Sequence, residues 1–117
     1  MKSKDTSAGQ HTFNSFNEFY PFYLSQHKNP VNILLHYIGT LIGYVFFVCG
    51  IFSLSIKPFI FGHLFAYALA WIGHFYFEKN KPATFKYPLY SYMGDHRMFY
   101  DITNRLVQGK KYSEHEI

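Results

Sequence analysis

The sequence predicts an all-α fold, an integral membrane helical hairpin with flanking amphipathic helices that together form a small bundle of about four helices. Aromatic residues make up 22% of the chain and charged residues only 15%, whereas about 25% charged residues is usual in a soluble domain. The charges are also unevenly placed, because Lys57 is the only Lys, Arg, Asp or Glu between Ile33 and Phe77.

A single domain over residues 13–108 is expected between two polar tails, at 1–12 and 109–117, and the first tail is predicted to be disordered. Residues 13–27 place aromatic side chains at helical spacing, among them Phe16 and Tyr23. This pattern predicts an aromatic helix that lies at a membrane interface or packs on other helices. Pro21 kinks this helix or begins a second one, and Asn29-Pro30 ends it.

Two uncharged segments predict the hairpin. Asn32 is expected to cap the first, Ile33–Ile56, and Lys57 with Pro58 separates it from the second, Pro58–Phe77. Both segments have about the 20 residues that are needed to cross a bilayer. Small residues in the first segment would let its neighbour approach closely, and these are Gly39, Gly43 and Gly50.

The charge distribution predicts the orientation of this hairpin. Two spans place both termini on one side, and nearly all lysines and arginines lie on that side. The positive-inside rule puts that side in the cytoplasm. The expected location is therefore the inner membrane of a bacterium or the endoplasmic reticulum of a eukaryote. The alternative is a buried helical pair in a soluble protein.

The last part of the domain predicts one more helix. The segment Tyr87–Tyr92 is aromatic and is expected at the membrane interface. Asp95 is the predicted N-cap of the helix, His96 is a residue at its start, and Gly109 follows its end. The apolar residues at helical spacing are Met98, Phe99, Ile102 and Leu106.

Composition argues against two other classes. The net charge is +4, but no basic stripe alternates with exposed aromatics on a recognisable nucleic-acid-binding module, so no nucleic-acid partner is expected. Cys49 is the only cysteine, which excludes an internal disulfide.

Histidines within the apolar segments indicate function, because ionisable groups are costly inside a membrane. A hairpin brings His36, early in the first span, beside His74, late in the second, and the turn at Asn29-Pro30 lets His27 reach the same place. Neutral imidazoles bind iron, zinc or copper, and three of them leave coordination positions open. Glu78, four residues after His74, is either a fourth ligand or an acceptor that orients an imidazole. His63 is interpreted as structural.

Two motifs resemble the Mpo1-like family of iron-dependent 2-hydroxy fatty acid dioxygenases. The first is the segment 27–36, HKNPVNILLH, and the second is the segment 73–83, GHFYFEKNKPA. A third segment, Pro88 to Met98, is similar to the end of the shorter bacterial members, so that the resemblance covers roughly residues 19–100.

The resemblance implies an enzyme that uses Fe2+ and molecular oxygen to shorten a 2-hydroxy fatty acid by one carbon. It implies that His27, His36 and His74 are the metal ligands. For such a reaction, we expect Glu78 and Asp95 to be catalytic. The expected substrate-binding residues are Asn32, Lys79 and Lys81, and Lys79, Lys81 or Lys28 would attract the carboxylate from the interface. The implied partners are a fatty acid or lipid substrate, oxygen and membrane lipids, and the oligomeric state is left open.

Two other functions stay open at this stage. One is a haem-binding membrane protein with axial ligands drawn from His63, His74 and His36. The other is a non-enzymatic membrane hairpin in which the histidines are structural. The membrane hydroxylases and desaturases are excluded, because their HxxHH clusters are missing from this sequence.

Overall fold

The computed structural model of the chain describes residues 12–110, and within that range all regular structure is helical. Helix α1 is Phe16–Ser25, α2 is Pro30–Ser53, α3 is Lys57–Ile72 and α4 is Pro88–Val107. A π-helical segment, Gly73–Glu78, continues α3, and a short 3-10 turn, Ala83–Phe85, precedes α4. The predicted all-α hairpin fold with about four helices is confirmed. The predicted tails fall outside the described residues, apart from 12, 109 and 110.

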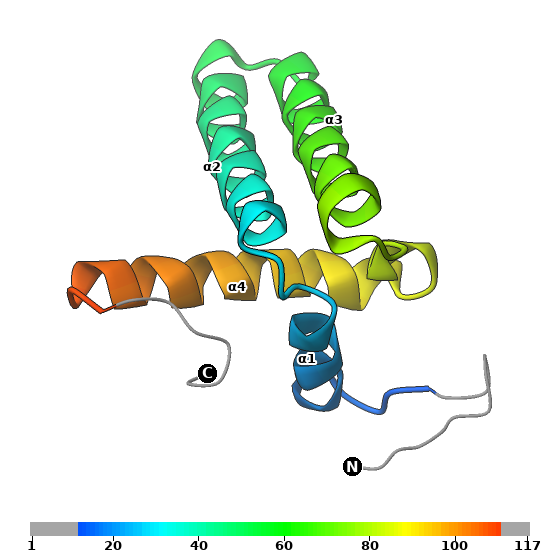
Figure 1. Cartoon of the computed structure of the whole chain (residues 1–117). Helices are drawn as coiled ribbons and strands as arrows, with labels where there is room; N and C mark the ends of the chain where they lie inside the picture. The colour runs from blue at the N-terminus through cyan, green and yellow to red at the C-terminus, as the bar shows by residue number, and fades with distance from the viewer. Residues whose placement is uncertain (1–11, 111–117) are drawn as a thin grey trace.

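Helices α2 and α3 form an antiparallel hairpin, α4 crosses the open end of the hairpin, and α1 lies on the far side of α4 (Figure 1). We call the end of the hairpin next to α4 its base and the turn at residues 54–56 its tip. The two helices of the hairpin approach each other closely at Gly39. A Cβ atom added there would lie only 3.2 Å from the backbone of Ala66. This close approach confirms the prediction made for Gly39.

The two long helical stretches meet the requirements for crossing a membrane. Pro30–Ser53 has 24 residues and Lys57–Glu78 has 22, which at about 1.5 Å per residue exceed a hydrocarbon core of about 30 Å. In each of these two stretches, only 22% of the most apolar segment is buried inside the protein. The exposed apolar residues include Leu41, Val45 and Leu64. The hairpin is therefore not the buried helical pair of a soluble core, and its apolar surface needs a cover.

The start of α2 corrects the predicted cap. The cap is Asn29 and not Asn32, since the Asn29 side chain accepts hydrogen bonds from the backbone N–H groups of Val31 and Asn32. Pro30 occupies the first helical position, where its fixed φ suits a helix and its missing N–H has no helical partner to lose. The helix therefore begins three residues before the predicted span.

The start of α4 corrects a second prediction. Asp95 is not an N-cap but lies inside the helix, because α4 already begins at Pro88 and includes the aromatic segment Tyr87–Tyr92 almost entirely. His96 is likewise an interior residue. The predicted end is confirmed, because Gly109 follows the helix with φ of +74° and donates its N–H to the carbonyl of Leu106.

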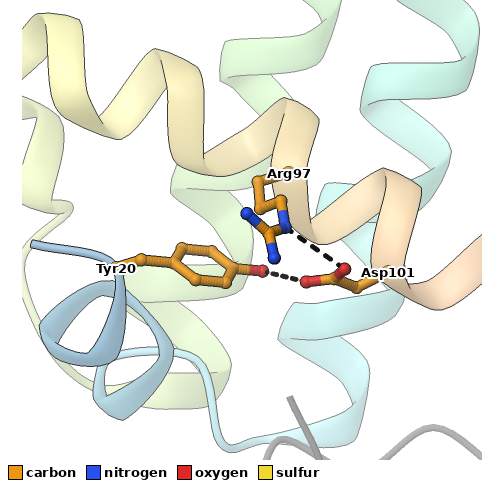
Figure 2. A network of polar contacts seen from close by, with 3 residues as sticks. All are labelled: Tyr20, Arg97 and Asp101. Carbon is orange, nitrogen blue, oxygen red and sulfur yellow. Dashed lines mark hydrogen bonds and ion pairs between the residues drawn. The ribbon is translucent and has the colours of Figure 1, made fainter. Parts of the chain in front are cut away.

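Helix α1 packs on α4 and runs through Pro21 without dividing. The buried core between them consists of Phe19, Tyr20, Tyr23, Leu24, Met98 and Ile102. Figure 2 shows a polar network in this contact, in which the Tyr20 hydroxyl donates to Asp101 at 2.8 Å and Arg97 bonds the same carboxylate at 3.3 Å. The packing and this network hold α1, and with it the residues that follow α1, against the base of the hairpin.

Candidate metal centre

Three histidines from three different segments meet at the base of the hairpin. His27 follows α1, His36 lies in the second turn of α2, and His74 lies in the π-helical segment. Their ring centroids are 4.5, 4.6 and 4.8 Å apart, and one ligand nitrogen from each lies within 4.8 Å of the other two. All three side chains are at most 5% exposed. The convergence that the hairpin topology predicted is therefore present, and metal binding by these residues stays a prediction.

Hydrogen bonds at Nδ1 define the protonation of the three rings. His27 Nδ1 lies 2.6 Å from the carbonyl of Tyr23, and His36 Nδ1 lies 2.9 Å from the carbonyl of Asn32. Carbonyl oxygens only accept, so both Nδ1 atoms carry the proton. His74 Nδ1 lies 2.7 Å from Oδ1 of Asn80, whose amide nitrogen donates to the carbonyl of Gln26. This second bond orients the amide, and His74 Nδ1 is also the donor.

With the proton at Nδ1, each Nε2 atom carries a lone pair. The Nε2 atoms of His27 and His36 are 3.2 Å apart, and without a proton between them this contact is repulsive. Burial, and then the neighbouring histidines, lower the pKa of His27 well below its usual value, so protonation does not relieve the repulsion. A cation between the nitrogens would do so.

The space among the histidines fits a single ion. A cavity of about 10 Å³ adjoins all three rings, which is the room of about one water molecule. Two metal–nitrogen bonds of about 2.1 Å can meet at one ion between the nitrogens of His27 and His36. Three neutral imidazoles are a donor set for iron, zinc or copper, whereas a porphyrin does not fit in this cavity.

Glu78 closes the turn that carries His27. Its Oε2 accepts the backbone N–H of Lys28 at 2.8 Å, and its Oε1 accepts the N–H of Asn29 at 2.8 Å and the side-chain amide of Asn32 at 3.1 Å. Both oxygens are engaged, which favours the orienting role over the ligand role among the two that the sequence left open. A catalytic role for Glu78 stays a prediction.

Glycine at two positions allows the segments to meet. A Cβ atom at Gly73 would lie 2.1 Å from Oδ1 of Asn32, and a Cβ atom at Gly94 would lie 2.6 Å from the ring of Tyr23. Because α4 has no side chain at Gly94, Tyr23 reaches between α4 and His27, on which it stacks at 4.0 Å. Sequence reasoning assigned Tyr23 only to an aromatic face and missed this contact, for which the sequence holds no separate signal.

A comparison with protein families identifies the domain. The family model described as 2-hydroxy-palmitic acid dioxygenase Mpo1-like matches residues 13–107, which include α1, the hairpin, α4 and all three histidines. The chain belongs to the Mpo1-like family. No curated protein and no solved structure matches it. The family resemblance read from the two histidine motifs is thereby confirmed.

In this Mpo1-like domain, Asp95 adjoins both the small cavity at the histidines and a second, larger cavity. It lines the small cavity and also one of about 310 Å³, and its Oδ1 accepts a hydrogen bond from the Tyr23 hydroxyl at 2.5 Å. Burial raises the pKa of Asp95 from 3.8 to about 7, although the bond from Tyr23 opposes the shift. The carboxyl can therefore hold or release a proton near neutral pH, and a catalytic role for Asp95 stays a prediction.

The shift of Asp95 predicts a pH dependence of stability. Because the folded state binds this proton more tightly than the unfolded state, the contribution is complete below pH 3.8 and is lost as the pH rises through about 7. We expect the difference in melting temperature between wild type and Asp95→Asn to fall over this interval and to be constant above it. Thermal unfolding in detergent across the pH range measures it, and a difference independent of pH would contradict the prediction.

The side chains of the other predicted site residues line neither of the two cavities. Lys79 and Lys81 are exposed beside the π-helical segment, and Lys79 has φ of +65°. Asn32 is fully buried against Gly73 and lines neither cavity, which favours a structural role over substrate binding. Substrate contacts of all three stay predictions.

Asn80 lies in the second of the two sequence motifs, but it was not predicted to be part of the site. It is the acceptor for His74 Nδ1, and groups that orient a ligand contribute about 10–100-fold to metal affinity. We therefore expect Asn80→Ala to weaken metal binding at the histidines by about 10–100-fold. Titration with Fe2+ under anaerobic conditions measures this loss. Asn104→Ala removes an exposed amide in α4 and is the matched control. Equal affinities of the two variants would refute the role of Asn80.

Proposed function

We propose that this Mpo1-like protein is a membrane-embedded, iron-dependent dioxygenase that shortens 2-hydroxy fatty acids by one carbon. The observation that carries the proposal is the set of three buried imidazoles, each with its proton held at Nδ1 and its Nε2 free of that proton, with one ligand nitrogen from each within 4.8 Å of the others. The description of the matching family, which names a 2-hydroxy-palmitic acid dioxygenase, supports the substrate class.

The ligand set suits ferrous iron in this reaction. His27, His36 and His74 would hold the ion, and three protein ligands leave positions for both oxygens of a 2-hydroxy acid and for molecular oxygen. When bound, the iron supplies the one-electron chemistry that activates oxygen. With oxygen as oxidant, the reaction balances when the carboxyl carbon leaves as carbon dioxide, carbon 2 becomes the new carboxyl carbon and one water forms.

Residues around the small cavity have defined tasks in this proposal. Asp95 takes the proton of the substrate hydroxyl, because its carboxyl borders both cavities and its pKa lies near neutrality. The buried hydroxyl of Ser91 lines the same small cavity and has no hydrogen-bond partner in the described part of the chain. It is therefore available to the substrate carboxylate. Lys79 and Lys81 attract that carboxylate from the interface.

The membrane completes the proposal. The exposed apolar surface of the hairpin is buried in lipid, and α1 and α4 lie at the cytoplasmic interface, where the positive-inside rule places both termini. This membrane is the bacterial inner membrane, or the endoplasmic reticulum in a eukaryote. The partners are the fatty acid, oxygen and membrane lipids, and nucleic acid is not among them.

Turnover by the purified protein tests the proposal. The protein is purified anaerobically in detergent, loaded with Fe2+ and supplied with oxygen and 2-hydroxyhexadecanoic acid, with hexadecanoic acid as the matched substrate. We expect oxygen uptake and an acid one carbon shorter from the hydroxy acid alone. An intense Soret band would instead support haem binding. A metal-free protein without turnover would support a non-enzymatic hairpin.

A further inference from the structure

A second cavity, of about 310 Å³, lies along the hairpin and shares wall residues with the small cavity at the candidate metal centre. The walls of this cavity and of the small one share His36, Tyr67, Ala70 and Asp95. A molecule in the large cavity therefore has one end beside the histidines. The rest of the cavity has no role in the proposed reaction at the histidines.

The lining residues show that the cavity is a groove along the hairpin. On α2 they run from His36 through Thr40 and Gly43 to Phe47, which is one face of the helix. The opposing face of α3 lines the groove from Ala70 back to Phe59. The groove therefore extends from the base of the hairpin toward its tip, with α4 on one side.

The length of the groove matches one lipid tail. From His36 to Phe47 the groove follows α2 for eleven residues, which corresponds to about 16 Å. One leaflet occupies half of a hydrocarbon core of about 30 Å, so that a single acyl chain extends about 15 Å into it. The groove thus runs along a membrane lipid tail from the interface to the bilayer centre.

The walls suit an apolar occupant. The middle is lined by small residues, Gly43, Gly62 and Ala66, which leave room beside the helices. Two polar pairs line the side toward α4, but their members bond each other, His63 with the Tyr92 hydroxyl at 3.0 Å and Tyr44 with His96 at 2.5 Å. At the far end Phe47 and Phe59 are 48% and 38% exposed, so the groove is accessible from the surrounding lipid.

We propose that this groove binds the acyl chain of the 2-hydroxy fatty acid, with the carboxyl end at the histidines and the methyl end at Phe47 and Phe59. The inference rests on the proposed function, since it takes the 2-hydroxy acid as the ligand. It adds that the substrate enters sideways from one leaflet and that the depth of the groove selects long acyl chains over short ones.

Photolabelling tests the groove without turnover. The full chain is placed in lipid nanodiscs with 2-hydroxyhexadecanoic acid that carries a diazirine near its methyl end, and labelled residues are identified by mass spectrometry. We expect labels on Phe47 and Phe59 on the groove side, and few on the outward-facing Leu41 and Val45.

Variants that fill the groove give the control. Ala66→Leu places a larger side chain in the groove, and Ala68→Leu makes the same change on the exposed side of α3. We expect labelling to fall about tenfold in Ala66→Leu and to be unchanged in Ala68→Leu. Gly43→Leu is a second filling variant, since a Cβ atom there would meet no atom nearer than 3.9 Å. Its labelling should fall in the same way, and both filling variants should keep the bound iron.

Three results would overturn the assignment. The first is an absence of labels in the groove. The second is labelling that remains at the wild-type level in both Ala66→Leu and Gly43→Leu. The third is equal labelling of the groove by a phosphatidylcholine that carries a diazirine in its tail. Failure of the proposed function is a separate result. A protein that labels in the groove but shows no turnover lacks the dioxygenase activity and keeps the acyl site. A protein that converts the substrate but shows no labelling in the groove has the dioxygenase activity but not the acyl-chain site.

Discussion

Under the proposed function, replacing His36 with alanine will remove both the bound iron and the dioxygenase activity. His36 offers one of three convergent nitrogens, and its Nε2 lies 3.2 Å from that of His27, so the variant leaves two ligands around the ion. Even a group that only orients a ligand contributes about 10–100-fold to metal affinity, and we expect the loss of a ligand to exceed about 100-fold. Metal analysis after anaerobic purification should find roughly one iron per wild-type chain and almost none in the variant.

His63→Ala is the matched control for iron content. His63 is a histidine of the same hairpin, but its Nδ1 bonds the carbonyl of Phe59 and its Nε2 bonds Tyr92, and it is not part of the group of three. This variant should keep its iron. If His36→Ala also kept its iron, the assignment of the metal site would be wrong. If neither the wild type nor the control held iron, the enzyme proposal would fail.

Gly73→Ala will push apart the start of α2 and the segment that follows α3, at the base of the hairpin. We expect it to weaken both the fold and the candidate metal site. The new Cβ atom would lie 2.1 Å from Oδ1 of Asn32 and 3.2 Å from its Cα, and the Asn32 side chain is fully buried and held by Glu78. The neighbours must therefore shift. Overpacking of this kind costs about 1–3 kcal/mol of stability. Thermal unfolding in detergent and Fe2+ titration measure the two effects.

Gly43→Ala is the control for this substitution. It makes the same change in the same hairpin, where the added Cβ atom would meet no atom nearer than 3.9 Å. Since alanine is favoured over glycine inside a helix by up to about 1 kcal/mol, this variant should be as stable as the wild type or slightly more stable. A Gly73→Ala protein with wild-type stability and iron affinity would show that the close contact with Asn32 has no structural importance.

The hydrophobic pattern of the chain was enough to predict the helical hairpin and the meeting of its histidines. The uncharged segments on both sides of Lys57 require two long apolar helices, and a short turn between them makes the helices antiparallel. Antiparallel packing then puts an early residue of the first helix, His36, beside a late residue of the second, His74. The motifs around them were enough to predict the Mpo1-like family, which the family comparison confirmed.

Helix boundaries and burial were less accessible to sequence reasoning. Asn29 and Asn32 are both good capping residues, and Asp95 is one too, so local preference could not select Asn29 or place Asp95 inside α4. The selection depends on the prolines at the first helical positions and on contacts with distant segments. The π-helical turn at Gly73–Glu78 was also missed, because a regular helical period continued through it.

The chemistry of the site, by contrast, follows from contacts that form when the chain folds. The carbonyl that accepts from His27, the amide of Asn80 that accepts from His74, and the stacking of Tyr23 on His27 depend on backbone geometry or on pairs that spacing does not reveal. The same is true of the groove, which exists because small residues of α2 and α3 face each other beside α4. Hydrophobic pattern and helical period determine which segments form and cross a membrane. The directions of lone pairs and the shape of a cavity arise only from packed side chains.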